Sequence, residues 1–451
     1  MWKNLCNVHN VLSAGGFFII LDASLCLVSI MQKFRVYPNH YFYDGPLDLT
    51  FPEDWDVEMC KMACHDEEAM TPEEIKAKIS DPIGSEPLGE MARNRKEAVI
   101  MVDDLSRITK AGLILPHVLE ELNGAGISDD HIRIMVSCGS HGHHWLEHLV
   151  KKVGGEMLER INVFTHSPWM NLVEVGETSR GNTLKVNREV MSCDLKVSIG
   201  SIDGHSSAGF SGGAKMIIPG ISGIDTICYM HRTIRQNGGT AGLSNLSNND
   251  CRGDMEDAAR MVGLDFTLDA VWNGKYELID LFCGDVVEAH RAGCERVSKA
   301  YATKLRKNVD VGVSNVYSVG YAQYGLSKES VKPDGDIAAL NFNAMGMLIH
   351  RTFGRWGSDY GGPLFRPGSL TNSVTEGESA TGGLNANGVI VVNPFPHSKS
   401  QEWRWQTNKI QWVKTWEAAL EKLTERHGPG TKVAIYPTEG HQRTAEELRI
   451  R

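Results

Sequence analysis

Residues 194–215 read DLKVSIGSIDGHSSAGFSGGAK, an apolar run followed by a polar loop rich in glycine. A strand that is buried on both faces has this continuous apolar pattern, and ligand-binding groups collect where such strands end. The same plan occurs at 96–104, KEAVIMVDD, and at 132–144, IRIMVSCGSHGHH. Three such units predict a doubly wound, mostly parallel sheet whose ligand crevice lies beyond the carboxyl ends of the strands.

A second series of strands begins near residue 300. Further buried-strand patterns are NVDVGVSNVYS, DGDIAALNF, NGVIVVNPF and TKVAIYPTEG, and QWVKTWEAALEKLTER between the last two has helical spacing. A chain of 451 residues is also long for a single core. We therefore expect an α/β fold with two domains, 31–300 and 301–451. Each is expected to be a Rossmann-like, mostly parallel sheet flanked by helices, with the active site in the cleft between them.

Residues 1–30 differ from the rest of the chain. They are apolar but interrupted by Asp22, with Lys3 as the only cation ahead of the apolar run, and Met31 then opens a strand pattern. We interpret 1–30 as a non-native or disordered N-terminal extension and exclude it from the fold argument. No other stretch reaches the roughly 20 apolar residues that span a bilayer, so no membrane association is expected.

Charge and cysteine content narrow the functional classes. The net charge of −10 argues against a nucleic-acid partner, so an anionic substrate would need local cations. The ten cysteines are scattered and form no CxxC pair, which excludes a zinc ribbon and a disulfide scaffold. A reducing compartment, the cytoplasm, fits this pattern best. The oligomeric state does not follow from the sequence.

The most informative segment runs from His205 to His231 and places several glycines around Lys215. Glycines let the backbone approach a bulky ligand and donate N–H groups to a phosphate. The P-loop pattern GxxxxGK[ST] is absent. From the residues alone, two interpretations stay open: a nucleotide- or anion-binding loop with one lysine and two histidines, or a tight turn that carries a surface lysine.

The run GHSSAGFSGGAK, followed by Pro219-Gly220 and His231, resembles the signature of the lactate racemase family. The resemblance implies that Lys215 is covalently joined to the nickel-pincer nucleotide, pyridinium-3-thioamide-5-thiocarboxylic acid mononucleotide. It also implies that His231 completes the square-planar coordination of nickel, a metal that imidazole suits. The loop residues that would contact this cofactor are Gly209, Ser211, Gly212 and Gly213.

A second motif, Asp104-Leu105-Ser106-Arg107, ends the strand at 96–104 and is similar to the family's D-x-[TS]-R. The resemblance implies that Asp104 and Ser106 hold the cofactor nucleotide and that Arg107 binds the substrate carboxylate. A guanidinium pairs with a carboxylate through two parallel hydrogen bonds, so the role suits the residue. An arginine that only bridges at a strand end is the structural alternative.

A third motif, Gly139-Ser140-His141, is similar to the family's G-[TLM]-H-R, although Gly142 stands where the family has arginine. The resemblance makes His141 and His205 the acid/base pair. A histidine near its ordinary pKa of about 6.5 can give and take a proton at neutral pH. By resemblance, one removes the hydroxyl proton of a 2-hydroxy acid while the Cα hydride passes to the cofactor. A 2-keto acid forms and is reduced again on its other face.

A fourth motif, 317–328, is similar to the family's Y-P-x-D-x-x-x-Y-Q-x-x-K. Tyr324 and Lys328 match, and Lys328 would help to hold the substrate carboxylate. Ser318, Gly320 and Gly325 replace the family's Pro, Asp and Gln. Because glycine for glutamine opens volume and removes a hydrogen-bonding group, we expect a 2-hydroxy acid larger or more polar than lactate.

The resemblance thus predicts an isomerase, a racemase or epimerase of a 2-hydroxy acid, that depends on cofactor-synthesis proteins. The first domain would bind the cofactor and the second would close over the substrate. Two other classes stay open. A metal-dependent hydrolase could be built on His141, His143 and His144, and a non-catalytic relative could bind only a nucleotide. His166 and His290 are expected to be structural.

Overall fold

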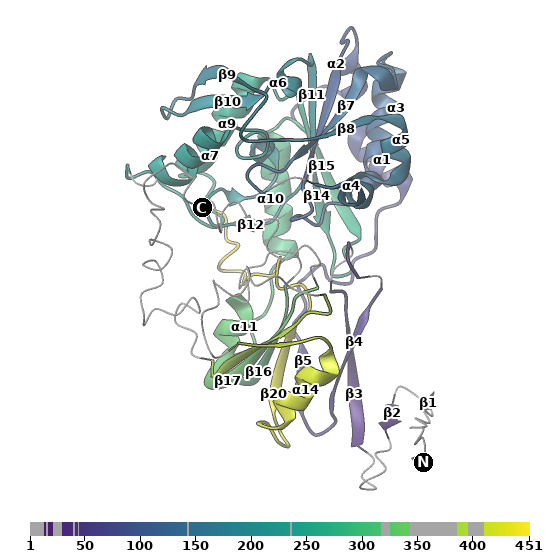
Figure 1. Ribbon diagram of the computed structural model, residues 1–451, viewed down its shortest axis with the longest axis vertical. Coiled ribbons are helices and arrows are strands. Elements are labelled where there is room, and N and C mark those ends of the chain that lie inside the picture. The colour runs from purple at the N-terminus through teal and green to yellow at the C-terminus, as the bar shows by residue number, and fades with distance from the viewer. Residues whose placement is uncertain are drawn as a thin grey trace, which may run out of the picture.

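The computed structural model describes residues 29–38, 41–43, 45–141, 144–234, 237–316, 325–342, 386–395 and 410–451, together with the short strands at 13–14 and 17–20. Two six-stranded, mostly parallel sheets dominate it, one in the upper and one in the lower half of Figure 1, and helices flank both. The α/β prediction with mostly parallel sheets is therefore confirmed. The domain boundaries at 30 and 300 stay predictions.

The first sheet has the strand order β15-β14-β11-β6-β7-β8. Only β15 runs antiparallel to its neighbour. Its strands are β6 (Ala98–Asp103), β7 (Ile132–Ser137), β8 (Asn162–Thr165), β11 (Leu195–Ser201), β14 (Phe266–Trp272) and β15 (Leu278–Gly284). The three strand patterns that opened the sequence analysis are thus the adjacent strands β6, β7 and β11.

Both faces of the first sheet are covered, which explains why its central strands are mostly apolar. Side chains alternate along β6, so Ile100 and Val102 join one core whereas Val99 and Met101 join the other. Each such side chain stabilises the fold by roughly 1.5–3 kcal/mol relative to exposure. The first core includes α1 (Pro72–Ser80), α2 (Leu88–Ala92), α3 (Leu115–Gly124) and α5 (Gly155–Arg160); the second includes α6 (Arg188–Met191) and α9 (Asp250–Val262).

The second sheet, β19-β18-β17-β16-β20-β5, is parallel throughout. Its strands are β5 (Asp56–Met59), β16 (Val309–Asn315), β17 (Val331–Leu340), β18 (Gly388–Val392), β19 (Ile410–Val413) and β20 (Lys432–Tyr436). The helices α11 (Gly325–Ser330) and α14 (Trp416–Thr424) contact it. β5 comes from the N-terminal part of the chain, and this long-range pairing has no signal in the sequence pattern.

The remaining elements are short. A third sheet contains β1 (Ser13–Ala14), β2 (Phe17–Ile20), β3 (Ser29–Val36) and β4 (Leu47–Pro52). Two hairpins are β9 (Leu172–Glu177) with β10 (Thr183–Asn187), and β12 (Gly204–His205) with β13 (Gly209–Phe210). Further helices are α4 (Leu146–Val153), α7 (Ile224–Cys228) and α10 (Glu288–Ala300). The single turns η1 (Ala111–Leu113), η2 (Asp129–His131) and η3 (Gly213–Met216) are 3₁₀ helices.

One local prediction was wrong in its extent. Residues 411–426 have helical spacing, but the helix begins only at Trp416. Residues 410–413 form the edge strand β19 instead. The Thr415 side chain accepts the backbone N–H of Ala418 and so caps the helix at that point. Among the described residues, no helix is long and apolar enough to cross a membrane.

Candidate active site

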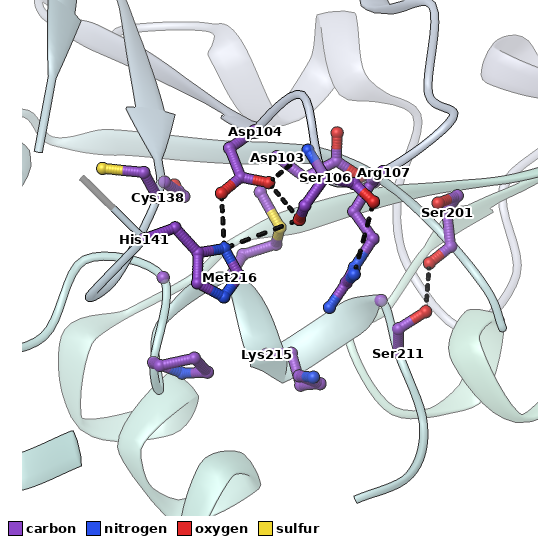
Figure 2. Close-up of a pocket in the computed structure, with 15 residues that line it drawn as sticks. Asp103, Asp104, Ser106, Arg107, Cys138, His141, Ser201, Ser211, Lys215 and Met216 are labelled. Carbon is purple, nitrogen blue, oxygen red and sulfur yellow. Dashed lines mark hydrogen bonds and ion pairs between the residues drawn. The ribbon is translucent and has the colours of Figure 1, made fainter. Parts of the chain in front are cut away.

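A pocket lies at the carboxyl ends of β6, β7 and β11 (Figure 2). From β6, the chain extends the sheet on one side through β7 and β8, and then returns to the other side of β6 to form β11. β6 and β11 therefore flank a topological switch point. Such points are where open α/β sheets bind ligands. The predicted residues that line this pocket are Asp104, Ser106, Arg107, His141, Ser211, Gly212 and Lys215.

Lys215 lies in η3, across the pocket from Asp104 and His141 (Figure 2). Burial lowers the pKa of its amine well below the ordinary value of 10.5, and the positive charges of Arg107 and Arg252 lower it further. The shift favours the neutral form of the amine. A neutral amine keeps the lone pair that a covalent bond to an electrophilic carbon requires.

Arg107 brings a positive charge to the same pocket from the loop after β6. Its Nη1 donates to the carbonyl of Ser106 at 3.5 Å. Within the described ranges, no carboxylate forms an ion pair with this guanidinium, and its donors are suited to a planar carboxylate.

His141, Asp104 and Ser106 form a connected group on one wall of the pocket (Figure 2). His141 Nδ1 lies 2.6 Å from Asp104 Oδ2. The other oxygen of Asp104 accepts the backbone N–H of Ser106 at 2.9 Å and also the hydroxyl of Ser106. Burial alone would raise the pKa of Asp104, but the charge and the hydrogen bond of His141 outweigh it and hold that pKa well below its usual range. Asp104 is therefore ionised.

His205 sits in the short strand β12, on the loop that leads to Lys215. Its Nδ1 accepts the backbone N–H groups of Ser207 and Ala208 at 3.2 and 3.1 Å. Burial lowers the pKa of His205 well below 6.5, and the charges of Lys215 and Arg107 add to the effect. The ring is therefore neutral, although His205 is not among the residues that line the pocket.

His231 lies in η4 (Tyr229–Thr233), a π-helical turn that follows α7. π-helical turns are rare and occur often at functional sites. Nδ1 donates to the carbonyl of Ile227 at 2.9 Å, and burial is the main reason that the pKa of His231 falls to about 4. A neutral ring that donates through Nδ1 carries its lone pair on Nε2, the form in which a histidine binds a metal.

The loop before Lys215 has a backbone that glycine alone adopts easily. Gly209 and Gly212 have φ values of +77° and +78°. A Cβ at Gly212 would also lie 2.6 Å from Asp269 Oδ1. The Ser211 hydroxyl donates to the carbonyl of Ser201 at 2.7 Å and accepts the N–H of Asp203 at 2.8 Å, so it ties the loop to the end of β11.

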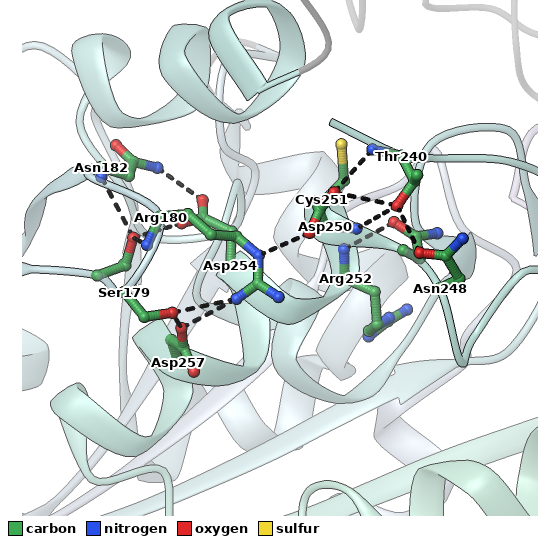
Figure 3. Close-up of polar contacts among 12 residues, drawn as sticks. Ser179, Arg180, Asn182, Thr240, Asn248, Asp250, Cys251, Arg252, Asp254 and Asp257 are labelled. Carbon is green, nitrogen blue, oxygen red and sulfur yellow. Dashed lines mark hydrogen bonds and ion pairs between the residues drawn. The ribbon is translucent and has the colours of Figure 1, made fainter. Parts of the chain in front are cut away.

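Buried polar side chains that the sequence analysis missed hold this loop in place. Arg252, on α9, donates to the carbonyls of Ala208, Phe210 and Gly212. Figure 3 places it next to the network by which α9 holds the β9–β10 hairpin. Asp269 accepts the N–H of Gly213 at 2.9 Å, and His290 Nε2 donates to the carbonyl of Ser211 at 2.8 Å. His290 is thus structural, as is His166, which donates to the carbonyl of Ser222 at 2.9 Å.

Replacing Arg252 by methionine is expected to lower the free energy of unfolding by about 3 kcal/mol, because buried carbonyls lose their donor. Denaturant unfolding would measure it. The control is Arg260→Met on the same helix, whose guanidinium makes an exposed ion pair with Asp257 and should change stability by less than about 0.5 kcal/mol. Equal effects from both variants would refute the anchoring role.

Lys328 is not among the residues that line this pocket. It lies on α11, next to Ser327, whose backbone N–H donates to the buried Glu439 at 2.8 Å. The described residues that line the pocket all lie between 103 and 220, so the predicted position between two domains stays a prediction. Gly142, His143, Ser318, Gly320 and Tyr324 lie outside the described residues.

The pocket includes further residues that the motifs did not indicate. These are Asp103, Ser137, Cys138, Gly200, Ser201, Met216, Pro219 and Gly220. Ser137 and Ser201 are the last residues of β7 and β11, so the rule that sites lie at strand carboxyl ends would have found both. The thiol of Cys138 is not a reactive group, because burial raises its pKa.

The side chains present fit the cofactor that the sequence resemblance implies. In the described part of the chain, no three His, Cys, Asp or Glu side chains gather into a metal site. Nε2 of His144, one of the histidines considered for a metal site, accepts the backbone N–H of Leu105 at 3.2 Å instead. The imidazole of His231 and the amine of Lys215, whose pKa is lowered, suit a nickel-carrying nucleotide that is joined to the protein.

Residues 42–242 match the family model of the lactate racemase N-terminal domain. Over these residues the chain is similar to the lactate racemase family. It is 33% identical over 229 residues to the lactate racemase of Lactiplantibacillus plantarum, covering 50% of this chain and 54% of that protein. It is 30% identical over 243 residues to that of Thermoanaerobacterium thermosaccharolyticum, covering 53% and 57%. The chain thus spans little more than half the length of these curated relatives.

Two solved structures share the fold of this chain. The lactate racemase apoprotein of Thermoanaerobacterium thermosaccharolyticum superposes with a TM-score of 0.63 at 22% identity, covering 91% of this chain and 99% of that one. A protein from Thermotoga maritima gives 0.56 at 18% identity, covering 83% and 98%. At these identities the likeness shows the fold. The family match contains every predicted site residue from Asp104 to His231, whereas Lys328 lies beyond it.

Proposed function

We propose that this protein is a racemase or epimerase of a 2-hydroxy acid that uses a nickel-pincer nucleotide joined to Lys215. The observation that carries the proposal is the pocket at the switch point. It combines an amine with a lowered pKa, an arginine that makes no carboxylate ion pair among the described residues, and a histidine bonded to an ionised aspartate. The cofactor, when bound, would supply the acceptor for the Cα hydride and return it to the opposite face.

The protein's own side chains would bind the substrate and move its hydroxyl proton. Arg107 would hold the carboxylate, since its guanidinium offers paired N–H donors inside the pocket. His141 and His205 would serve as the acid/base pair. Lys215 would be the attachment point, and Nε2 of His231 would face nickel. Asp104, Ser106 and the glycine loop would contact the nucleotide.

The substrate is proposed to be larger or more polar than lactate. The support is Gly325, where the family pattern has glutamine; no described residue lies within 4 Å of a Cβ placed there. The second sheet would then close over the substrate and bring Lys328 to its carboxylate. In support, His441, which follows β20, lies 2.5 Å from Asp203 in the loop after β11. The C-terminal segment thus reaches the loops that surround the pocket, as Figure 1 also shows.

The test is to produce the protein together with the cofactor-synthesis enzymes and to measure intact mass, nickel content and racemisation. We expect a nucleotide-sized mass increase on the peptide that contains Lys215 and about one nickel per chain, as a single imidazole ligand implies. Single enantiomers of lactate, sugar acids and other polar 2-hydroxy acids would then be assayed for inversion, and the polar acids are expected to react faster.

Each alternative has its own outcome. A loaded protein that inverts no 2-hydroxy acid would refute the racemase proposal, and a preference for lactate would refute its substrate part. Nickel without modification of Lys215 would favour the metal-dependent hydrolase. A chain with neither nickel nor modification would favour the non-catalytic nucleotide-binding relative.

A further inference from the structure

The two proposed acid/base histidines are held by different groups. His141 Nδ1 lies 2.6 Å from a carboxylate oxygen of Asp104 and 3.5 Å from the hydroxyl of Ser106. A carboxylate only accepts, so Nδ1 of His141 carries the proton and Nε2 carries the lone pair. The partners of His205 Nδ1 are two backbone N–H groups, which only donate. Nδ1 of His205 therefore carries the lone pair, and its Nε2 carries the proton.

Asp104 is well placed to hold His141 in this form. Its Oδ1 is occupied by the N–H and hydroxyl of Ser106, which leaves Oδ2 directed at the imidazole. The carboxylate is 2% exposed, and its hydrogen bonds all run to protein groups that fix its orientation. Figure 2 shows the ring edge of His141 that is remote from Asp104 turned toward Lys215.

We propose that Asp104 is a positioning residue that fixes the tautomer and orientation of His141, and that the two histidines therefore start a turnover in unequal forms. This inference rests on the proposed racemase function and reassigns Asp104 from nucleotide binding. The hydroxyl proton of a bound 2-hydroxy acid moves to Nε2 of His141, and the O–H bond breaks as the N–H bond forms. The resulting imidazolium keeps its Nδ1–H on Asp104 and holds the abstracted proton on Nε2.

His205 takes the complementary part in this half of the reaction. Its Nε2–H donates a hydrogen bond to a substrate oxygen. Nε2 of His205 can accept a proton only after the ring changes tautomer, so that Nε2 has lost its proton and Nδ1 carries one. This change requires the N–H groups of Ser207 and Ala208 to move away. Of the two histidines, only His141 is thus paired with a carboxylate through Nδ1. Removing the carboxylate of Asp104 should therefore leave the tautomer of His205 unchanged.

Nitrogen-15 NMR of histidine side chains tests the tautomers directly, because a protonated and an unprotonated ring nitrogen resonate far apart. The cofactor-free wild-type protein is used, with signals assigned from His141→Asn and His205→Asn. We expect a protonated Nδ1 for His141 and a protonated Nε2 for His205. A protonated Nε2 on His141 would overturn the inference, whether or not the protein racemises anything.

The Asp104→Asn variant then tests the positioning role. We expect the His141 ring signals to shift and those of His205 to stay, kcat of the loaded enzyme to fall on the order of 10²-fold, and KM and nickel content to change by less than about twofold. Unchanged His141 signals with lost cofactor would return Asp104 to nucleotide binding and refute the proposal. Unchanged kcat would refute it as well.

The matched control is Asp254→Asn. Asp254 is also a buried carboxylate, held by Thr178 and Asn182 at 2.6 and 2.7 Å, but it lies outside the pocket (Figure 3). Its substitution should leave both histidine patterns and kcat unchanged. If it reproduced the effects of Asp104→Asn, those effects would reflect loss of any buried carboxylate, and the inference would fail.

Discussion

A Lys215→Ala protein, produced beside the cofactor-synthesis enzymes, is expected to show no nucleotide-sized mass increase and no racemisation. The reason is that Lys215 places its amine, whose pKa is lowered, in the pocket. Activity is expected to fall to background, a loss of at least about 10⁴-fold, because the proposed chemistry belongs to the tethered group. Intact-mass spectrometry and the racemisation assay measure the two losses.

Two further variants separate loss of attachment from loss of folding. Lys215→Met nearly keeps the side-chain volume, so it should fold while staying unmodified. Lys196→Met removes another buried lysine, whose amine donates to the carbonyl of Cys193 at 2.7 Å near the opposite end of β11. That control is expected to keep both modification and activity. Full activity in either Lys215 variant would refute the attachment.

Single substitutions of His141 or His205 by asparagine are expected to leave the cofactor attached and to stop turnover. General acid–base catalysis contributes typically 10²- to 10⁴-fold, so kcat should fall by about that factor. Mass and nickel content should match the wild type, because the proposed cofactor contacts are Lys215 and His231. Steady-state racemisation from each enantiomer, with mass spectrometry on the same samples, tests this expectation.

The sheet offers a matched control for the histidine variants. His131 Nδ1 lies 2.7 Å from Glu97 Oε1, a histidine–carboxylate pair like that of His141 but near the amino ends of β6 and β7. His131→Asn should leave kcat unchanged. A turnover defect in that variant as large as in His141→Asn, or loss of nickel in either site variant, would contradict the assignment of acid/base roles.

Three strands of the first sheet, β6, β7 and β11, were predictable from their local sequence. They are mostly apolar, and the polar residues that follow them include Asp104, His141 and the loop to Lys215. Four strands of the second sheet were predictable in the same way, but β5 and β19 were not. The pairing of β5 with β20 joins segments far apart in the chain, and apolar patterning carries no information about distant partners.

The supporting residues of the site were not predictable. Arg252 lies in an ordinary helical pattern, and its role depends on where the carbonyls of residues 208–212 point in the folded loop. The tautomers of His141 and His205 were not predictable from the sequence either, because each depends on whether Nδ1 forms a hydrogen bond with a carboxylate or with a backbone N–H. The motif match identified which residues matter; three-dimensional hydrogen bonding determines the protonation state in which each one starts.

The strand order also sets an order of events during synthesis. All strands of the first sheet, and the groups that anchor the lysine loop, lie before residue 300. The loop can therefore assemble while the ribosome is still translating the later strands. β5 cannot pair at that stage, because its partner strand β20 is translated only from residue 432 onward. A nascent chain thus exposes an unpaired strand edge for most of its translation, a state prone to misassociation that chaperones commonly shield.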